Sequence, residues 1–211
     1  PLAGVDQGLA LYDPCCGSGT IAIEAAQIAC RMAAGAHRRF GFERLRMFDA
    51  HVWQQLKEQA KAQECAPRAK VFASDVAFRM VDFAKRNAER AGVAHAIELR
   101  GGDALQRMPP GEAPGVMLVN PPYGERIETA GVAGSSRRGV RTPEPFEDEI
   151  DTGGSAKAGR ETGQVEDGGD FFNQLASHWK KNYAGWRAWV LTPDLKLPGR
   201  MRLKESCKVP M

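Results

Sequence analysis

The sequence predicts an α/β fold, a doubly wound and mostly parallel sheet with helices on both faces. Short apolar segments alternate along the chain with longer segments whose apolar residues recur at helical spacing. Several of the short segments end at an Asp, a glycine-rich turn or an Asn-Pro step, at the position where parallel strands carry binding sites. The 211 residues suffice for one such domain, which we expect to span the whole chain, 1–211.

The first half of the chain opens with an apolar segment at 9–12 that stops at Asp13 and a glycine-rich turn. Helical spacing of apolar residues then predicts a helix from about residue 20. A basic connection with interleaved aromatic residues, 37–48, leads to a second helix over about 50–63, for which Asp49 is well placed as the N-cap.

The same alternation continues through the rest of the chain. Further strands are expected at 70–74, 96–99, 116–119 and 186–191, and further helices at 78–91 and 171–179. The segment 116–119 is nearly all apolar, as a strand covered by helices on both faces should be. Because such strands are connected by right-handed crossovers, their C-terminal ends should meet at one edge of the sheet.

The segment from about 126 to 169 differs in composition from the rest. It is rich in Gly, Ser, Thr, Arg and Glu and holds only scattered apolar residues, too few for a core. We therefore expect a polar, mobile insertion beside the site and not a second domain.

Composition excludes several classes of protein. No apolar run approaches the roughly 20 residues that cross a bilayer, and the N-terminal segment lacks the order of a secretory signal, so we expect a cytoplasmic protein without a membrane partner. The five cysteines and four histidines show no metal-ligand spacing, which predicts no metal. The net charge of +3 is compatible with a polyanionic partner but does not require one. The oligomeric state stays open.

A glycine-rich loop after the first strand is the first candidate binding element. It lacks the Lys-Ser or Lys-Thr of a phosphate-binding loop, and Ala22 occupies the third glycine position of the dinucleotide pattern. Asp75 could accept hydrogen bonds from ribose hydroxyls and Asp103 from an adenine amino group, so a nucleoside without phosphates fits the set. A plain turn and helix caps are the competing interpretation. The expected cofactor-binding residues are Asp13, Pro14, Cys16, Gly17, Ser18, Gly19, Thr20, Asp75, Val76, Asp103, Ala104 and Asn120.

The sequence Asn120-Pro121-Pro122-Tyr123 is the most specific motif and the expected catalytic site. Two prolines remove backbone donors, so the Asn side chain and the adjacent carbonyl can present acceptors to an amino group. Two acceptors would orient the nitrogen lone pair toward a methyl sulfonium. Tyr123 offers a face on which a base could stack. A rigid turn that ends a strand is the competing interpretation. The expected substrate-binding residues are Tyr123, Arg126, Arg39 and Arg44.

The arginines and aromatics of the connection 37–48 are compatible with contacts to RNA. An equally good interpretation is a solvated surface whose aromatic side chains anchor the connection to the core.

Two long motifs resemble the THUMP-associated RNA guanine-N2 methyltransferases, above all the bacterial members that act on 23S ribosomal RNA. The motifs are DPCCGSGTIAIEAA at 13–26 and NPPYGER at 120–126. Further similar stretches are 39–44, 74–75, 87–88, 91–92, 185–186 and 191–195. The resemblance implies a class I, Rossmann-like methyltransferase domain. It also implies that S-adenosylmethionine is the cofactor and that RNA, 23S rRNA or a ribosomal assembly intermediate, is the partner.

Within this resemblance, the loop around Gly17 and Gly19 holds S-adenosylmethionine, Asp75 its ribose and Asp103 its adenine, while residues 120–123 grip the guanine amino group. Family members also carry an N-terminal THUMP domain and end the sheet with a β-hairpin. We expect this chain to lack the former and the last strands of the sheet. A DNA adenine-N6 enzyme, a protein glutamine-N5 enzyme and a non-catalytic nucleotide-binding fragment remain alternatives.

Overall fold

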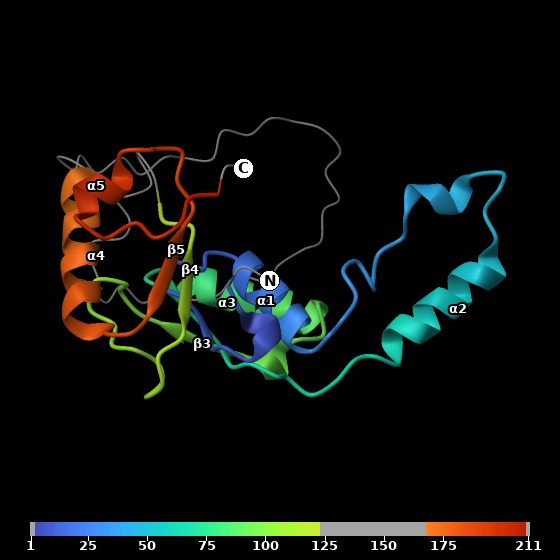
Figure 1. Cartoon of the computed structure of the whole chain (residues 1–211). Helices are drawn as coiled ribbons and strands as arrows, with labels where there is room; N and C mark the ends of the chain where they lie inside the picture. The colour runs from blue at the N-terminus through green and yellow to red at the C-terminus, as the bar shows by residue number, and fades with distance from the viewer. Residues whose placement is uncertain (1–2, 123–167, 210–211) are drawn as a thin grey trace, which may run out of the picture.

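The computed structural model describes residues 3–122 and 168–209 and shows five parallel strands in the order β3-β2-β1-β4-β5 (Figure 1). The strands are β1 Leu11–Asp13, β2 Val71–Asp75, β3 Ile97–Gly101, β4 Val116–Val119 and β5 Arg187–Val190. In the central strand, Leu11 lies opposite Val71 of β2 on one side and Val116 of β4 on the other.

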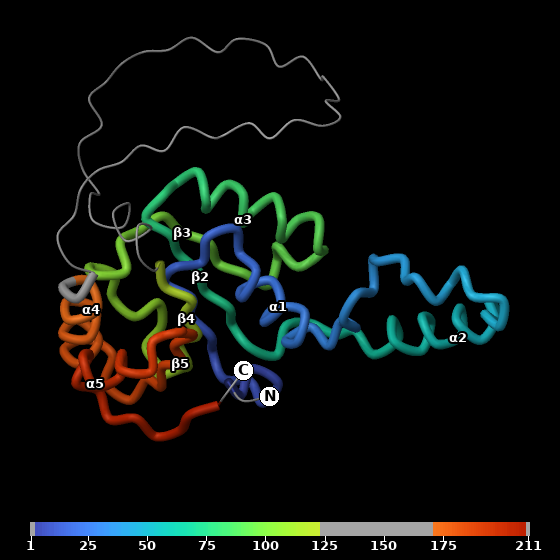
Figure 2. Tube along the Cα trace, turned by 90° about the horizontal axis from the view of Figure 1, so that it is seen from above, coloured from blue at the N-terminus to red at the C-terminus, as the bar shows by residue number. Residues whose placement is uncertain are grey.

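Helices cover both faces of the sheet (Figure 2). One face carries α1 Thr20–Ala29 and α3 Phe78–Arg90, and the other carries α4 Gly168–Asn182 and α5 Leu197–Met201. Short 3-10 turns lie at η1 Val5–Gln7, η2 Gly41–Arg44 and η3 Ala94–Ala96. The predicted doubly wound α/β fold is confirmed, and every strand pair in the described ranges is parallel.

Each face of the sheet has its own apolar cluster, because successive strand residues point to opposite sides. Leu11 and Val71 pack on the α1 face, while the next residues, Tyr12 and Phe72, pack on the α4 face. Helix α1 meets the sheet through alanines at helical spacing, namely Ala22, Ala25, Ala26 and Ala29. Small side chains let this helix lie close to the strands, so its N-terminal loop is held near the sheet edge.

Most elements lie where the periodicity predicted them, within a few residues at their ends. Helix α4 begins at Gly168, so the last two residues of the expected insertion 126–169 are helical. The remainder of that insertion, 126–167, lies outside the described residues. No helix in the described ranges is long and apolar enough to cross a membrane.

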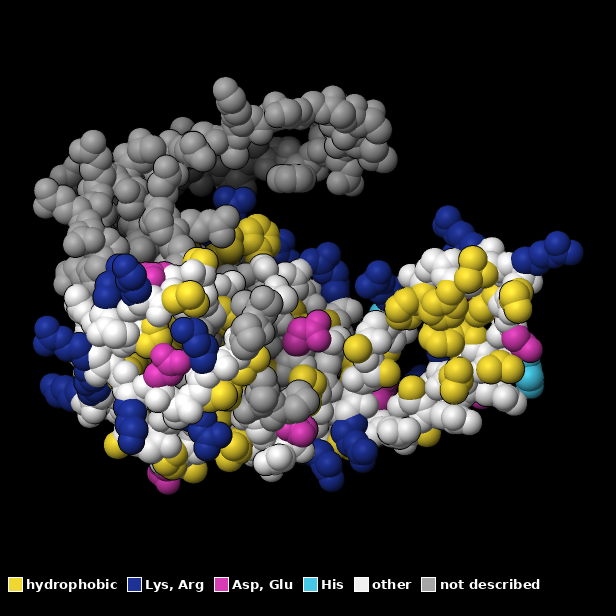
Figure 3. Space-filling view, turned by 45° about the horizontal axis from the view of Figure 1, so that its top comes forward, with side chains coloured by type: hydrophobic (Ala, Val, Ile, Leu, Met, Phe, Trp, Pro, Cys, Tyr) yellow, Lys and Arg dark blue, Asp and Glu magenta, His cyan; other side chains and the backbone are white. Residues whose placement is uncertain are grey.

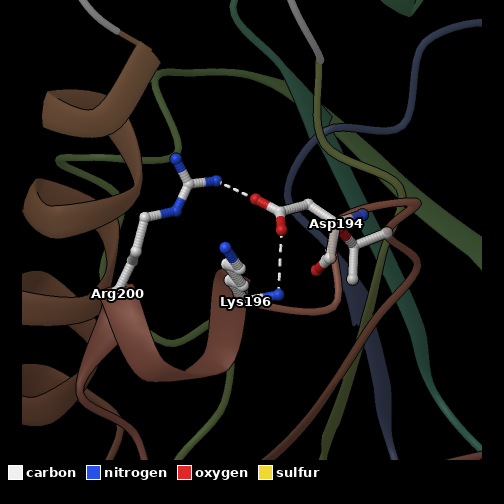
Figure 4. Close-up of polar contacts among 4 residues, drawn as sticks. Asp194, Lys196 and Arg200 are labelled. Atoms are coloured by element: carbon white, nitrogen blue, oxygen red, sulfur yellow. Dashed lines mark hydrogen bonds and ion pairs between the residues drawn. The ribbon is translucent and has the colours of Figure 1, made fainter.

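The sequence did not predict helix α5, which follows β5 (Figure 4). Asp194 lies three residues before this helix: its Oδ1 accepts a 2.8 Å hydrogen bond from the Lys196 amide, and its Oδ2 pairs with the Arg200 guanidinium. Thr192 Oγ1 accepts a 3.0 Å bond from the Asp194 amide. Leu197 and Met201 are buried on the α4 side, so five residues suffice for a stable turn of helix here.

Residues 37–62, hereafter the arm, project away from the sheet and carry α2 Ala50–Lys61 (Figures 1 and 2). None of the α2 residues is buried. The N-cap role of Asp49 is confirmed, because its Oδ1 accepts bonds from the amides of His51 and Val52 at 2.9 and 3.0 Å. The chain enters and leaves the arm side by side, where the Cys65 amide donates to the Cys30 carbonyl at 2.9 Å.

An aromatic cluster formed by Phe40, Phe42, Phe48 and Trp53 holds the arm together. The Trp53 ring meets Phe40 and Phe42 edge to face, with centroids 5.8 and 5.0 Å apart. These aromatic side chains pack on one another and on α2, and not on the core of the sheet. The interpretation that they anchor the connection to the core is therefore wrong.

We predict that Trp53→Ala unfolds the arm without unfolding the sheet. An isolated helix of 12 residues is marginal in water, so α2 depends on this ring. Amide hydrogen exchange across 50–61 should approach the unprotected rate, while the free energy of unfolding of the sheet should change by less than about 1 kcal/mol. The neighbouring substitution Gln54→Ala, at an exposed position, should leave the exchange of α2 slow. Equal destabilisation of β2 and α2 by Trp53→Ala would contradict an independent arm.

Candidate functional site

The loop between β1 and α1 turns at two glycines with left-handed backbone, Gly17 at φ 52° and Gly19 at φ 90°. A side chain at Gly19 would place its Cβ only 2.9 Å from the Cβ of Ala84 in α3. Nothing lies within 4 Å of the corresponding position at Gly17. The first glycine therefore leaves open space at the loop, and the second lets the start of α1 pack directly on α3.

Asp75, at the end of β2, fixes this loop from the neighbouring strand. Its Oδ2 accepts a 2.9 Å bond from the Gly17 amide, and its Oδ1 accepts a 2.9 Å bond from the Ala77 amide. A carboxylate has about four acceptor positions, so two of them stay available to a ligand. The side chain is half-buried, which leaves them within reach of one.

Asn87 of α3 supports the same loop, donating a 2.8 Å bond from Nδ2 to the Ser18 carbonyl. Sequence reasoning gave Asn87 no role, because an Asn on a helix has many uses and periodicity places it only near the core. The signals available were its place in a similar stretch that begins at residue 87 and its position twelve residues after Asp75, and only the packing of α3 against the loop gives them a meaning.

Asp13 is the most unusual residue of the site. Its side chain is buried, with 1% of its surface exposed, and Oδ1 accepts a 3.2 Å bond from the Cys15 amide. Oδ2 has no hydrogen-bond partner among the described residues. Burial above all, with Asp75 nearby, raises the pKa of Asp13 to about 7, although the Cys15 amide opposes the shift. Such a buried acceptor is suited to a cationic donor brought by a ligand.

The two cysteines of the loop are not poised as nucleophiles. Burial first, and the Asp13 carboxylate second, raise the pKa of both Cys15 and Cys16 above the usual value for a thiol. Both thiols therefore stay protonated near neutral pH, and the thiolate is the reactive form. Cys16 and Cys15 instead pack in the apolar clusters on the two faces of the sheet.

Asp103 follows β3 and is buried, with 8% of its surface exposed. Its Oδ1 accepts a 2.9 Å bond from the Leu105 amide, so the side chain shapes a turn, as the competing interpretation also expected. The far end of that turn is tied to α4, because the Arg107 carbonyl accepts bonds from His178 Nε2 at 2.7 Å and the Tyr183 hydroxyl at 2.8 Å. The segment with Asp103 and Ala104 is thereby held at the sheet edge.

Asn120 and the two prolines follow β4 directly. Asn120 is exposed, Pro121 is buried and Pro122 is half-buried. Strand β4 is the direct neighbour of β1, with Met117 opposite Tyr12. Asn120 lies three residues beyond Met117, and Cys15 lies three residues beyond Tyr12, so the Asn-Pro corner and the glycine loop leave adjacent strands at the same edge.

The structure thus brings most of the expected site residues to one edge of the sheet. Asp75 accepts a bond from Gly17 and interacts electrostatically with Asp13, while Asp103 and Asn120 follow the strands β3 and β4 on either side. Pro14 and Cys16 are buried, Val76 is half-buried, and Ser18 and Thr20 are exposed. Tyr123 and Arg126 lie outside the described residues. No cluster of metal-ligating side chains occurs at 3–122 or 168–209.

Arg39 and Arg44 are not part of this group. They lie on the arm, which leaves the body after α1 has run away from the edge that carries the glycine loop. A helix of ten residues is about 15 Å long, so the base of the arm lies at the opposite end of α1 from that loop.

The chain matches a known protein family and is similar to curated proteins. Residues 1–135 match the family described as RMKL-like, methyltransferase domain. The chain is 36% identical over 206 residues to a ribosomal RNA large subunit methyltransferase K/L of Shewanella baltica, and 35% identical over 211 residues to that of Shewanella amazonensis. It aligns over 95% and 98% of its own length, but spans only about a quarter of those relatives, 24% and 25%.

Solved structures share the fold. A protein from Clostridium difficile described as a possible methylase has a TM-score of 0.69 and 28% identity, over 95% of this chain and 44% of that one. Another, assigned as a methyltransferase and complexed with SAH, has a TM-score of 0.70 and 23% identity, over 94% of this chain and 43% of that one.

We predict that Asp13→Asn stabilises the protein at alkaline pH. The pKa of Asp13 is raised from 3.8 to about 7, so above pH 3.8 the unfolded carboxyl ionises while the folded one stays protonated. This costs stability progressively up to pH 7, and the full cost, on the order of 4 kcal/mol, applies above it. The Asp13→Asn variant should exceed the unaltered protein in free energy of unfolding by about 4 kcal/mol near pH 8. Near pH 5.5 its advantage should be about 2 kcal/mol smaller.

Urea unfolding at the two pH values measures this difference. Asp6→Asn, which changes an exposed carboxylate in η1, is the matched control and should show no comparable pH-dependent gain. A stability gain for Asp13→Asn that is equal at both pH values would show that the carboxyl is not titrating near 7.

Proposed function

The chain belongs to the family of RMKL-like methyltransferase domains, and from that premise we propose that it transfers a methyl group from S-adenosylmethionine to the N2 amino group of a guanine in large-subunit ribosomal RNA. The observation that carries the proposal is the neighbouring position of two motifs. The glycine loop, with the buried Asp13 whose Oδ2 has no partner among the described residues, leaves β1, and the Asn-Pro corner leaves the adjacent strand β4. The site for the methyl donor and the site for the amino group that accepts the methyl would then lie side by side, at the ends of the adjacent strands β1 and β4.

The residues of the edge fit S-adenosylmethionine. The free Oδ2 of buried Asp13 would accept a bond from a cationic group such as the methionyl ammonium. The remaining acceptor positions of Asp75 suit the ribose hydroxyls, and the turn at Asp103 and Ala104 would lie by the adenine. Open space at Gly17 allows close approach of the ligand to the backbone. The cofactor supplies an electrophilic methyl group on a sulfonium centre.

The chemistry required of the protein is orientation more than base catalysis. The Asn120 side-chain oxygen and the adjacent backbone carbonyl would accept hydrogen bonds from the two hydrogens of the amino group. These bonds direct the nitrogen lone pair toward the methyl donor. Pro121 and Pro122 lack amide hydrogens, so no backbone donor competes at this corner. Because burial keeps Cys15 and Cys16 protonated, a thiolate attack on a pyrimidine ring is disfavoured.

RNA is the proposed partner because of the relatives' names and the two long motifs. The N2 position of guanine, and 23S rRNA or an assembly intermediate as the substrate, rest on the resemblance of NPPYGER and the glycine loop. Tyr123 and Arg126 would contact the target nucleotide, and Arg39 and Arg44 would contact RNA from the arm. We place this activity in the cytoplasm. DNA adenine-N6 and protein glutamine-N5 transfer share the chemistry and are the alternatives.

We predict that Asn120→Ala abolishes methyl transfer while the affinity for S-adenosylmethionine stays within about tenfold, because the lost contacts belong to the reacting amino group. The measurement uses labelled cofactor and unmodified large-subunit rRNA transcribed in vitro, followed by nucleoside analysis. Label in N2-methylguanosine supports the proposal. Label in another nucleoside, or transfer only to protein, would replace it with one of the alternatives.

Asn173→Ala, which truncates an exposed Asn on α4, is the matched control and should keep both activity and cofactor affinity. Unchanged turnover of Asn120→Ala would refute the role of the Asn-Pro corner.

A further inference from the structure

We propose that the arm, residues 37–62, is a separate RNA-binding platform that contacts the ribosomal RNA outside the catalytic edge. The inference rests on the proposed function for the identity of the polymer, and it assigns to the arm a role in affinity and positioning, not in chemistry. Four properties of the arm support it: its net charge, the engagement of its acidic side chains, its exposed apolar surface and its place in the fold.

The arm concentrates the positive charge of the chain. It contains six lysines and arginines and three acidic residues, whereas the rest of the chain holds 23 of each. The net charge of the whole protein, +3, is therefore the net charge of the arm. A protruding segment with all the excess cationic charge is suited to a polyanion.

The acidic residues of the arm are engaged in its own structure. Glu43 Oε1 accepts a 2.8 Å bond from the Phe40 amide, Asp49 caps α2, and Glu58 Oε1 accepts a 2.9 Å bond from Gln54. Within the described residues no carboxylate pairs with Arg38, Arg39, Arg44 or Arg46, whose side chains are exposed. Arg38 lies over the Phe40 ring, 5.5 Å from its centroid. These guanidinium groups can bind phosphates without first breaking an ion pair.

The arm also exposes apolar side chains that a solvated loop would not need. Met47 is 95% exposed and Leu45 64%, and Phe42, Val52 and Leu56 are each about half-exposed. Figure 3 shows hydrophobic side chains gathered on one face of the arm, with Lys and Arg side chains projecting at its outer end. Cations beside apolar and aromatic surface match RNA with unpaired bases, which bind by phosphate contacts and stacking.

The aromatic cluster prepares this surface in advance. Phe40 and Phe42 stack with centroids 5.3 Å apart, and Trp53 closes the cluster from α2. The arm therefore holds its shape without help from the core, and RNA binding need not order it. Because its base lies at the end of α1 remote from the glycine loop, the arm would engage a stretch of RNA other than the target nucleotide.

The test compares RNA binding by the whole chain with that of two charge variants. The arm variant is Arg39→Gln, Arg44→Gln and Arg46→Gln, and the control is Lys204→Gln, Lys208→Gln and Arg79→Gln, which removes three exposed charges from the body. The probe is unmodified large-subunit rRNA transcribed in vitro, with affinity measured over a range of salt concentrations. Far-ultraviolet circular dichroism checks that each variant is folded.

We expect the arm variant to bind at least about tenfold more weakly and its plot of log K against log salt to be less steep by about 2, since each single-strand phosphate contact contributes about 0.7. In the control, the loss of RNA affinity and the change in the slope of the salt plot should each be at most about half of those in the arm variant. Equal losses in both variants would mean nonspecific electrostatics and would overturn the platform. Unchanged RNA affinity together with loss of self-association, measured by light scattering, would assign the arm to a protein partner instead.

Failure of the proposed function is seen separately. Affinity for S-adenosylmethionine should be the same in the arm variant and in the unaltered chain, since the arm is remote from the glycine loop. If neither chain transfers methyl groups to RNA but the arm variant alone loses RNA affinity, the platform stands and the methyl-transfer assignment falls.

Discussion

The hydrogen bond between the Gly17 amide and the Asp75 carboxylate is the contact on which the catalytic edge depends. It joins the loop after β1 to the end of β2, and with the Ala77 amide on Oδ1 it leaves about two acceptor positions of Asp75 available. Asp13 is then enclosed beside a second carboxylate, with one oxygen lacking a partner in the described structure. The domain thus buries a titratable carboxyl group where a cationic ligand could compensate its ionised form.

The sequence was sufficient for the parallel sheet, because strands β1, β2 and β4 are short apolar runs that end in the residues of the site. It also located the Asp49 cap, since capping is a local interaction between a side chain and the next amides. Helix α5 was missed because five residues show no periodicity, and its start depends on Asp194, Lys196 and Arg200 meeting in space.

The support of the site was less predictable than its motifs. Asn87 reaches the Ser18 carbonyl from a helix 69 residues away in sequence, and Gly19 is required by contact with Ala84. Both depend on how α3 packs against α1, which no local pattern encodes. The aromatic residues at 40–53 show the same limit: their composition was clear, but whether they packed on the core or on each other was decided by tertiary structure.

The separation of the arm from the catalytic edge has a consequence for specificity. Contacts at the edge can discriminate one exocyclic amino group from another, because they meet the reacting atoms. Contacts on the arm act on phosphates and neighbouring bases, so they add affinity and choose a region of RNA without altering the reaction. When one contact holds the RNA, the second site meets the same polymer at a high effective concentration. Two weak contacts then give a higher overall affinity, provided that both can be made at the same time. A stiff arm, held by its own aromatic cluster, meets that condition better than a flexible tail of the same charge would.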